Sequence, residues 1–456
     1  MISFDTIANV YFIGAGGIGM SALARYFNAL GKKVAGYDKT PSDLTSQLIK
    51  EGIDIHFKDS ADHIPALYRK MEGTLVVYTP AIPDDHEELN YFRKNAFTML
   101  KRAEVLGLIT RNKKSVAVAG THGKTTIATM ISWILSHTEA SCSAFLGGIS
   151  KNFNSNLVLH SQSEWVVAEA DEYDRSFLQL HPYAAVITSM DADHLDIYGN
   201  LQELHRSFGE FTAQISNKGF LVIKKGLPVD LSRLNCKAFT YSMNEKADYH
   251  ASSVRLDKAV YYFDVNTPSG LIRSVSLSHP GLLNIENAVA AIAVAHQLGC
   301  EEDIIRNALA TFSGNQRRFD VILKTKDLIY IDDYAHHPRE IEATLRSLKE
   351  LYPGKRITGI FQPHLYSRTR DLALDFARSL SLLDELILLD IYPAREKPIR
   401  GVSADSILRH VHIRDKMICS KSALLDVLKQ KHVEVLITMG AGDIDRFIEP
   451  IKKIYS

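Results

Sequence analysis

The chain has few cysteines and no long apolar run. Its four cysteines stand far apart without a Cys-x-x-Cys spacing, at Cys142, Cys236, Cys300 and Cys419. This distribution argues against both a disulfide framework and a zinc site. No apolar stretch approaches the ~18 residues of a membrane span, and the N-terminus lacks a basic segment followed by an apolar one. We therefore expect a cytosolic protein with reduced cysteines.

An excess of charge of either sign is also missing. Lys and Arg together number 53, as do Asp and Glu, so no global field favours nucleic acid or an anionic membrane as a partner. The 456 residues are 46% hydrophobic, which is enough for buried cores. At ~150 residues per domain, this length predicts about three domains.

What is present is a glycine loop whose sequence predicts phosphate binding. The apolar run Val116–Ala119 predicts a buried strand, and the spacing of apolar residues over Ile127–Leu135 predicts a helix. The segment between them reads Gly120-Thr121-His122-Gly123-Lys124-Thr125-Thr126. In such a loop backbone N–H groups hold a phosphate, the lysine reaches the β and γ oxygens, and the Thr125 hydroxyl binds Mg²⁺. Only two residues separate the glycines, so an ordinary glycine turn is the alternative.

A second glycine loop lies near the N-terminus. The strand candidate Val10–Ile13 runs into Gly14-Ala15-Gly16-Gly17-Ile18-Gly19, and a second strand, Val34–Tyr37, ends at Asp38. This G-x-G-x-x-G pattern, with an acid about twenty residues on, predicts a Rossmann-type domain. The pattern alone does not choose between NAD and the pyrophosphate of a nucleotide sugar. A glycine turn that only allows close packing is the third alternative.

Acidic side chains follow two further strand candidates. Trp165–Ala168 leads into Glu169-Ala170-Asp171-Glu172, and Ala184–Thr188 leads into a segment that contains His194. A carboxylate beside the phosphate loop suits Mg²⁺, which prefers oxygen ligands. An acidic loop is often just solvated, and a lone histidine is as often a packed structural residue as a metal ligand.

The last third of the chain predicts another α/β unit. Strand candidates begin at Leu328, Ile357, Leu386 and Val435, and each leads into a polar or glycine-containing loop. These loops would meet at one edge of a sheet. The stretch from Gly219 to Ser278 is β-rich, and the next helix is expected to begin near Leu282, with Asn284 as its cap. Ser313–Asp320 is the expected hinge, where Arg317 and Arg318 either meet phosphate or stay solvated.

The motifs, taken together and in order, resemble those of the Mur ligase family of bacterial cell-wall synthesis. The segments that carry the resemblance are Gly120–Thr126, Glu169–Glu172, Asp193–Asp196, Asn284–Asn287, Arg317–Phe319 and Asp332–Pro338. The resemblance implies an α/β fold of three domains: a Rossmann-like UDP-sugar domain (1–103), a central P-loop ATPase-type domain (104–313) and a C-terminal Rossmann-like domain (314–456). The opening Gly14–Ser21, with Gln362–Asp371 and Tyr392–Gly401, is most similar to members that add L-alanine.

The implied reaction consumes ATP. ATP would phosphorylate the lactyl carboxylate of UDP-N-acetylmuramate, and L-alanine would attack the resulting acyl phosphate. Two Mg²⁺ ions are expected, with Mn²⁺ as an alternative. The implied protein is a cytoplasmic bacterial monomer or homodimer whose partners are small molecules, without nucleic-acid binding or membrane insertion.

The resemblance also implies residue roles. The ATP-binding residues would be Gly120, Thr121, His122, Gly123, Lys124, Thr125, Thr126, Asn287, Arg318 and Asp333. The substrate-binding residues would be Gly14, Gly16, Gly17, Gly19, Met20, Ser21, Asp38, Ser176, Tyr334, His336 and Arg368. The metal ligands would be Thr125, Glu169 and His194, and the catalytic residues Lys124, Glu169, His194, His336 and Arg368.

Several positions depart from the family pattern. Leu365 stands where many alanine-adding members carry Arg, Ser189 where many carry Asn, and Leu283 where many carry His. The next lysine after the Asp-His segment is Lys218, too far along for the carbamylated lysine of other members, so we expect no carbamate. Two rivals remain: a recycling ligase that attaches a tripeptide to the same UDP-sugar, and an NAD-dependent dehydrogenase or nucleotide sensor.

Overall fold

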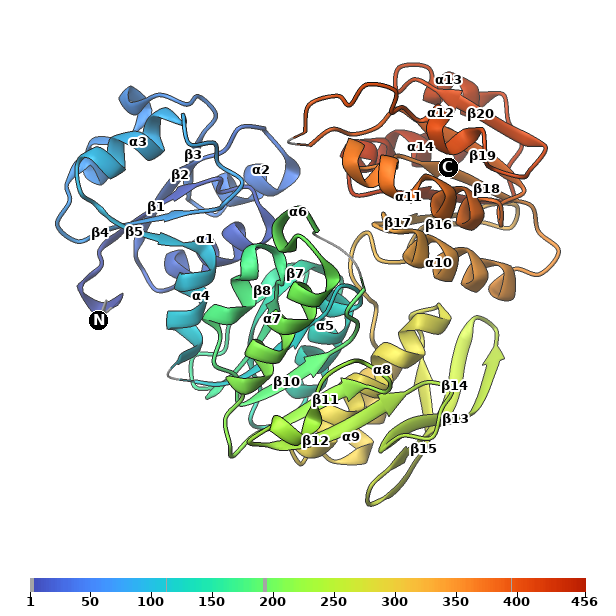
Figure 1. Cartoon of the computed structure of the whole chain (residues 1–456), viewed down its shortest axis with the longest axis horizontal. Helices are drawn as coiled ribbons and strands as arrows, with labels where there is room; N and C mark the ends of the chain where they lie inside the picture. The colour runs from blue at the N-terminus through green and yellow to red at the C-terminus, as the bar shows by residue number, and fades with distance from the viewer. Residues whose placement is uncertain (1–3, 112, 192–194, 395) are drawn as a thin grey trace. The chain divides into compact units, whose positions relative to one another are not determined.

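The computed structural model describes residues 4–111, 113–191, 195–394 and 396–456, and it contains three sheets (Figure 1). Each sheet is mostly parallel and is accompanied by helices, so the predicted α/β class is confirmed. By contacts the chain divides into two compact units. The first comprises Met1–Val254, Phe263–Ser276 and Asn287–Phe312, and the second comprises Arg255–Tyr262, Leu277–Glu286 and Ser313–Ser456.

The first sheet has the strand order β3-β2-β1-β4-β5. Its strands are β1 (Asn9–Ile13), β2 (Lys33–Tyr37), β3 (Asp54–His56), β4 (Thr74–Tyr78) and β5 (Thr98–Lys101). The helices are α1 (Ile18–Ala29), α2 (Asp43–Lys50), α3 (Glu87–Lys94) and α4 (Arg102–Arg111), with short 3₁₀ turns η1 (Phe4–Thr6), η2 (Ala61–His63) and η3 (Ala66–Arg69). All pairings are parallel, and Ile13 is in register with Tyr37 and Tyr78. The strand order reverses beside β1, so the loop after β1 lies where such sheets bind ligands.

The second sheet has ten strands, in the order β15-β14-β13-β12-β11-β10-β6-β9-β7-β8. They are β6 (Lys114–Ala119), β7 (Ser143–Ser150), β8 (Ser155–Val158), β9 (Trp165–Ala170), β10 (Ala184–Ile187), β11 (Phe220–Lys224), β12 (Lys237–Ser242), β13 (Tyr249–Asp257), β14 (Val260–Thr267) and β15 (Gly270–Leu277). The helical segments are α5 (Lys124–Ser136), η4 (Tyr173–Gln179), α6 (Leu195–Tyr198), α7 (Leu201–Ala213), η5 (Leu231–Arg233), α8 (Leu282–Gln297) and α9 (Glu302–Ala310). Because β6 lies between β9 and β10, the loops after these three parallel strands meet at one edge.

Helix α8 corrects one expectation. It begins at Leu282, so Asn284 lies inside its first turn and is not its cap. The Asn284 Nδ2 atom instead donates to the Pro280 carbonyl at 2.6 Å.

The third sheet lies in the second unit and has the order β16-β17-β21-β18-β19-β20. Its strands are β16 (Asp320–Lys324), β17 (Ile329–Asp333), β18 (Ile357–Phe361), β19 (Glu385–Leu389), β20 (Asp415–Cys419) and β21 (Val435–Met439). Its helical segments are α10 (Pro338–Leu351), α11 (Tyr366–Leu380), α12 (Asp405–Leu408), α13 (Leu424–Lys429), η6 (Asp443–Phe447) and α14 (Ile448–Tyr455). Only β16 runs antiparallel among these strands.

The central strands of the third sheet are largely continuous apolar runs, and this explains why both faces of the sheet are buried. Ile331 and Ile437 belong to one buried cluster, whereas their neighbours Tyr330 and Leu436 belong to another. Successive side chains of a strand point to opposite faces, so a continuous apolar run buries both. In the first unit, one buried cluster contains residues of both sheets, such as Phe12 and Ala117, which fixes the two glycine loops in one packed body.

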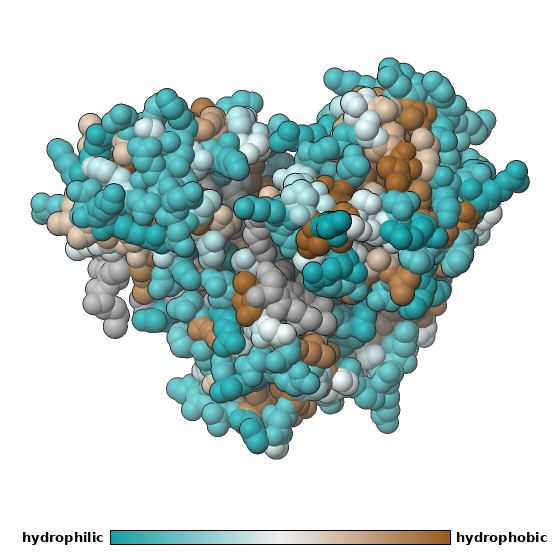
Figure 2. All heavy atoms as spheres, turned by 45° about the horizontal axis from the view of Figure 1, so that its top comes forward, coloured by the Kyte–Doolittle hydropathy of each residue, from teal (hydrophilic) through white to brown (hydrophobic). Residues whose placement is uncertain are grey.

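The surface agrees with the composition. Hydrophilic residues cover most of the face in Figure 2, and hydrophobic residues occur there in small groups. All four cysteines are free thiols, and burial raises the pKa of each. Within the described ranges, no helix combines the length and the apolar character that crossing a bilayer demands.

A buried acid in the first sheet predicts how stability changes with pH. The Glu88 side chain on α3 is fully buried, and it accepts a hydrogen bond of 2.8 Å from the Tyr11 hydroxyl. Burial raises the pKa of Glu88 to about 8. A raised carboxyl pKa means that the fold favours the protonated form, so its contribution is complete below the unfolded value of ~4.3 and is lost as pH rises toward 8.

We therefore expect Glu88→Gln to flatten the pH dependence of stability. Between pH 5 and 8 the free energy of unfolding of the parent should fall by a few kcal/mol more than that of the variant. Calorimetric Tm values across this range measure the difference. Glu87→Gln is the matched control, because Glu87 is the exposed neighbour on the same helix. Parallel Tm curves for parent and Glu88→Gln would contradict the expectation.

Candidate active site

The phosphate loop joins β6 to α5 and needs glycine at two positions. Gly120 has φ 130° and Gly123, which precedes the first residue of α5, has φ 79°. A Cβ atom on Gly120 would lie 2.1 Å from Thr188 Oγ1, and one on Gly123 would lie 2.9 Å from Asn287 Oδ1. The backbone conformation and the close neighbours therefore both exclude side chains at these two positions, as in loops whose backbone approaches a phosphate closely.

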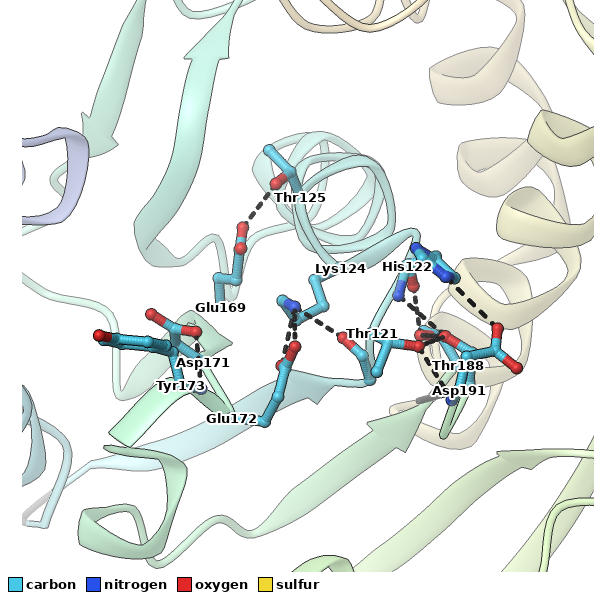
Figure 3. Close-up of polar contacts among 12 residues, drawn as sticks. Thr121, His122, Lys124, Thr125, Glu169, Asp171, Glu172, Tyr173, Thr188 and Asp191 are labelled. Carbon is cyan, nitrogen blue, oxygen red and sulfur yellow. Dashed lines mark hydrogen bonds and ion pairs between the residues drawn. The ribbon is translucent and has the colours of Figure 1, made fainter. Parts of the chain in front are cut away.

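Lys124 is held by a buried carboxylate that the sequence interpretation did not single out. Its Nζ atom lies 2.8 Å and 3.0 Å from the two Glu172 carboxylate oxygens and 2.7 Å from the Gly120 carbonyl oxygen (Figure 3). Glu172 is 1% exposed. Burial disfavours the ammonium, but Glu172, Glu169 and Asp171 outweigh it and raise the pKa of Lys124, so the lysine is charged at neutral pH.

Thr125 and Glu169 form a pair of oxygen groups at the same loop. The Thr125 hydroxyl donates to Glu169 Oε2 at 2.7 Å (Figure 3). The Glu169 carboxylate fills the space beside Gly147, where a Cβ atom would lie 2.0 Å from Oε2. One hydroxyl and one carboxylate suit Mg²⁺, which completes its shell with water and substrate phosphates. The third predicted metal ligand, His194, lies outside the described residues.

The loop is supported by the segment after β10. Ser189 Oγ accepts a hydrogen bond of 2.8 Å from the His122 N–H and lies 2.9 Å from Thr121 Oγ1. The His122 ring pairs with Asp191 at 3.3 Å, and Thr188 Oγ1 donates to the His122 carbonyl (Figure 3). The serine at position 189, a departure from the family pattern, thus takes part in holding the loop. Thr126, also predicted to bind ATP, is buried in the first turn of α5.

The first glycine loop has its predicted acid beside it. The Gly16 N–H donates to Asp38 Oδ2 at 2.7 Å, and the Gly17 N–H donates to the Gly14 carbonyl at 3.3 Å. Met20 and Ser21 are buried in the first turns of α1, so their side chains support the loop from inside. Any ligand contact they make remains a prediction.

A buried asparagine joins this loop to the second sheet. Asn156 on β8 is fully buried, and its Nδ2 atom donates to the Ile18 carbonyl at 2.6 Å and to Ser21 Oγ at 2.9 Å. Its side-chain oxygen accepts from Arg25 of α1. Ser176 lies in η4, next to Asp174 and Arg175, whose φ values of 53° and 52° kink that segment.

The second unit holds most of the remaining predicted residues. Asp333 ends β17, and its carboxylate accepts hydrogen bonds from Thr344 Oγ1 at 2.9 Å and from the Ala335 N–H at 3.0 Å. Burial raises the pKa of Asp333 to about 6, although Arg318 opposes the shift. The Arg318 guanidinium lies 4.8 Å from the centre of the Tyr334 ring.

His336 and Arg368 are placed near the start of two helices. The His336 Nδ1 atom lies 3.0 Å from the Tyr334 carbonyl oxygen and 3.3 Å from Glu340 Oε2. Arg368 lies in the first turn of α11, which follows Leu365. Leu365 has φ 71°, a backbone region that costs a non-glycine residue free energy and often marks functional segments.

The Lys124–Glu172 pair leads to a testable expectation. Removing one partner of a buried ion pair leaves an uncompensated charge, so Glu172→Gln should destabilise the ligand-free protein by about 3 kcal/mol. Added MgATP should restore more stability to the variant than to the parent, because phosphate replaces the lost carboxylate. Thermal unfolding with and without MgATP measures both effects. Asp174→Asn, at a more exposed acid of the same segment, is the control, and an equal MgATP shift in variant and parent would contradict the expectation.

Taken together, a Rossmann-type sheet and a phosphate-loop sheet with Lys124, Thr125 and an acidic strand end define an α/β nucleotide-binding protein of the phosphate-loop class. Residues 9–114 match the Mur ligase family catalytic domain, residues 118–295 the Mur ligase middle domain, and residues 317–442 the Mur ligase glutamate ligase domain. The chain belongs to the Mur ligase family.

Individual relatives agree along the whole chain. A protein of Parabacteroides distasonis named UDP-N-acetylmuramate–L-alanine ligase is 53% identical over 455 residues, which cover 99% of this chain and 98% of that one. The crystal structure of UDP-N-acetylmuramate-alanine ligase MurC from Thermotoga maritima has a TM-score of 0.83 at 28% identity and covers 98% and 99% of the two chains. A murein peptide ligase from Psychrobacter arcticus, at 21% identity and TM-score 0.72 with 98% of both chains covered, shares the fold.

Proposed function

We propose that this protein is an ATP-dependent ligase that joins L-alanine to the lactyl carboxylate of UDP-N-acetylmuramate in peptidoglycan precursor synthesis. The observation that carries the proposal is the 53% identity, over nearly the full length, to a relative named for this reaction. The geometry supports it, because a charged lysine and a hydroxyl–carboxylate pair surround a loop suited to a triphosphate.

The proposed reaction has two steps. First, a lactyl carboxylate oxygen attacks the γ-phosphorus of ATP, the bond to the β-bridging oxygen breaks, and ADP leaves. Lys124 neutralises charge on the transferred group, and Thr125 and Glu169 would hold Mg²⁺, which supplies further neutralisation. Then the free amine of L-alanine attacks the acyl carbonyl, loses its proton, and phosphate leaves.

The roles of the remaining residues are part of the proposal. In the first unit, Asn287 lies against Gly123, a position suited to the nucleoside side of ATP. By family resemblance Asp333 would contact the ribose, Arg318 a phosphate, and Tyr334, His336 and Arg368 the alanine end of the reaction. His194 would hold a second metal ion. Domains of 1–103, 104–313 and 314–456, action in the bacterial cytoplasm, and a monomeric or dimeric state complete the proposal.

The test is ADP release with UDP-N-acetylmuramate, MgATP and one amino-acid substrate at a time. We expect turnover with L-alanine and none without the sugar nucleotide. Turnover only with the tripeptide L-alanyl-γ-D-glutamyl-diaminopimelate would support the recycling ligase instead. A change in nicotinamide absorbance without ATP consumption would support a dehydrogenase, and no ATP consumption with any of these substrates would refute the ligase assignment.

A further inference from the structure

Arg102 lies against the first glycine loop and pairs with Asp171 in the acidic segment after β9. It is the first residue of α4, directly after β5, and its side chain is 20% exposed. Its Nη1 and Cδ atoms lie 2.9 Å and 3.0 Å from the position that a Cβ atom on Gly19 would occupy. Gly19 is the last glycine of the first loop and lies in the first turn of α1. The absence of a side chain at Gly19 therefore lets the guanidinium lie against the start of this helix.

Most of the hydrogen-bonding capacity of Arg102 is unused by protein groups. Its Nη2 atom donates to Asp171 Oδ2 at 3.1 Å, and among the described residues this carboxylate is its one hydrogen-bond and ion-pair partner. A guanidinium has five N–H donors in a planar fork. Asp171 is 37% exposed and also accepts from the Tyr173 N–H at 3.1 Å, so it holds one arm of the fork and orients the rest.

The first turn of α1, which reads Ile18-Gly19-Met20-Ser21, supplies no basic side chain of its own beside Arg102. The first turn of α1 contains no acidic residue, and the nearby Asp38 carboxylate accepts from the Gly16 N–H. Backbone N–H groups and a helix N-terminus supply only partial positive charge, worth roughly half a unit. A diphosphate carries about two negative charges, so a full positive charge beside this turn complements it. Arginine forms two parallel hydrogen bonds to phosphate oxygens when its fork is available.

We propose that Arg102 is a substrate-binding residue that grips the diphosphate of the nucleotide sugar at the first glycine loop, with Asp171 orienting its side chain. This proposal deepens the proposed function and rests on it. It also explains why a charged, mostly buried residue opens α4 at the point where the chain passes from the first sheet to the second.

The test compares matched variants in their binding of UDP, which has the diphosphate but lacks the sugar and its lactyl group. Arg102→Met retains an aliphatic side chain of similar length and removes the guanidinium. We therefore expect the Kd for UDP and for UDP-N-acetylmuramate to rise by about 10- to 100-fold. Arg102→Lys should recover part of this loss. ADP binding at the phosphate loop should change by less than about threefold, which also verifies folding. Titration calorimetry at constant ionic strength measures the dissociation constants of all three ligands.

Asp171→Asn separates ligand binding from a purely structural ion pair. In Asp171→Asn the side-chain oxygen still accepts the hydrogen bond that orients Arg102, whereas the competing negative charge is gone. If Arg102 binds the diphosphate, the Kd of this variant for UDP should therefore stay within about threefold of the parent value or fall. If Asp171→Asn weakens UDP binding as much as Arg102→Met does, the pair is structural and the proposal is overturned. Lys101→Met, which removes the adjacent Lys101–Asp174 ion pair of 3.0 Å, is the control for general loosening of this region.

Two further binding results would overturn the proposal for Arg102. Normal UDP binding by Arg102→Met, with binding of UDP-N-acetylmuramate alone weakened, would reassign Arg102 to the lactyl carboxylate and overturn the diphosphate proposal. Unchanged binding of both ligands would remove Arg102 from the site. In either case a parent protein that releases ADP with L-alanine leaves the proposed function intact, whereas an inactive parent would refute that function first.

Discussion

Lys124→Ala is expected to lower the rate of ADP formation by at least about 10³-fold, because charge neutralisation on the transferred phosphoryl group is the main catalytic contribution of this loop. Binding of UDP-N-acetylmuramate is expected to persist, since the first glycine loop belongs to a different sheet. A coupled ADP-release assay and titration calorimetry measure the two quantities.

The matched control for this prediction is Lys114→Ala. Lys114 begins the same strand, β6, but its side chain is 53% exposed and pairs only loosely with Glu164, at 3.4 Å. Its replacement should leave both rate and binding within about twofold, as is usual for exposed pairs. Loss of sugar-nucleotide binding in Lys124→Ala would contradict the prediction and indicate misfolding or a wrong division into domains.

Glu169→Gln is the second change with a large expected effect. Glutamine still accepts the hydrogen bond from Thr125 and fits beside Gly147, so the fold should be retained. The variant lacks the negative charge that a Mg²⁺ ligand supplies, and we expect kcat to fall by about 10³-fold, equivalent to ~4 kcal/mol in the barrier. The Mg²⁺ concentration required for half-maximal rate should rise as well.

ADP formation measured across a Mg²⁺ titration tests this second expectation. Glu164→Gln is the control, because Glu164 lies just before the same strand with a side chain that is 75% exposed. An unchanged Mg²⁺ requirement in Glu169→Gln would show that this carboxylate does not hold the metal ion.

Local sequence patterns predicted the strands and the loops that follow them. The apolar runs at Val10–Ile13 and Val116–Ala119 lie within β1 and β6, and both glycine loops join a strand to a helix as expected. These features depend on residues close together in the chain, so apolar runs and glycines reveal them. The order of the motifs along the chain, which resembles that of the Mur ligase family, predicted an α/β fold of three domains.

Partners distant in sequence were not predictable in the same way. Lys124 and Glu172 are 48 positions apart, and the acidic segment after β9 offers several carboxylates that the sequence treats as equivalent. Only the packing of β6 beside β9 selects Glu172 for the lysine and Glu169 for Thr125. Arg102 was not predicted to belong to the site, because nothing near it in the sequence shows that it lies against Gly19. The strained backbone of Leu365 likewise has no local signal, since leucine rarely adopts positive φ.

The carboxylate that accompanies Lys124 has a consequence for discrimination among anions. A small ion such as chloride or inorganic phosphate would have to displace Glu172 to reach the ammonium, and it offers fewer contacts than a triphosphate in return. A bound triphosphate would contact backbone N–H groups, a Mg²⁺ ion and the lysine at once, so it would compete with Glu172 where small ions would not. In a cell rich in simple salts, this internal counter-ion would therefore keep small anions away from Lys124 when no nucleotide is bound.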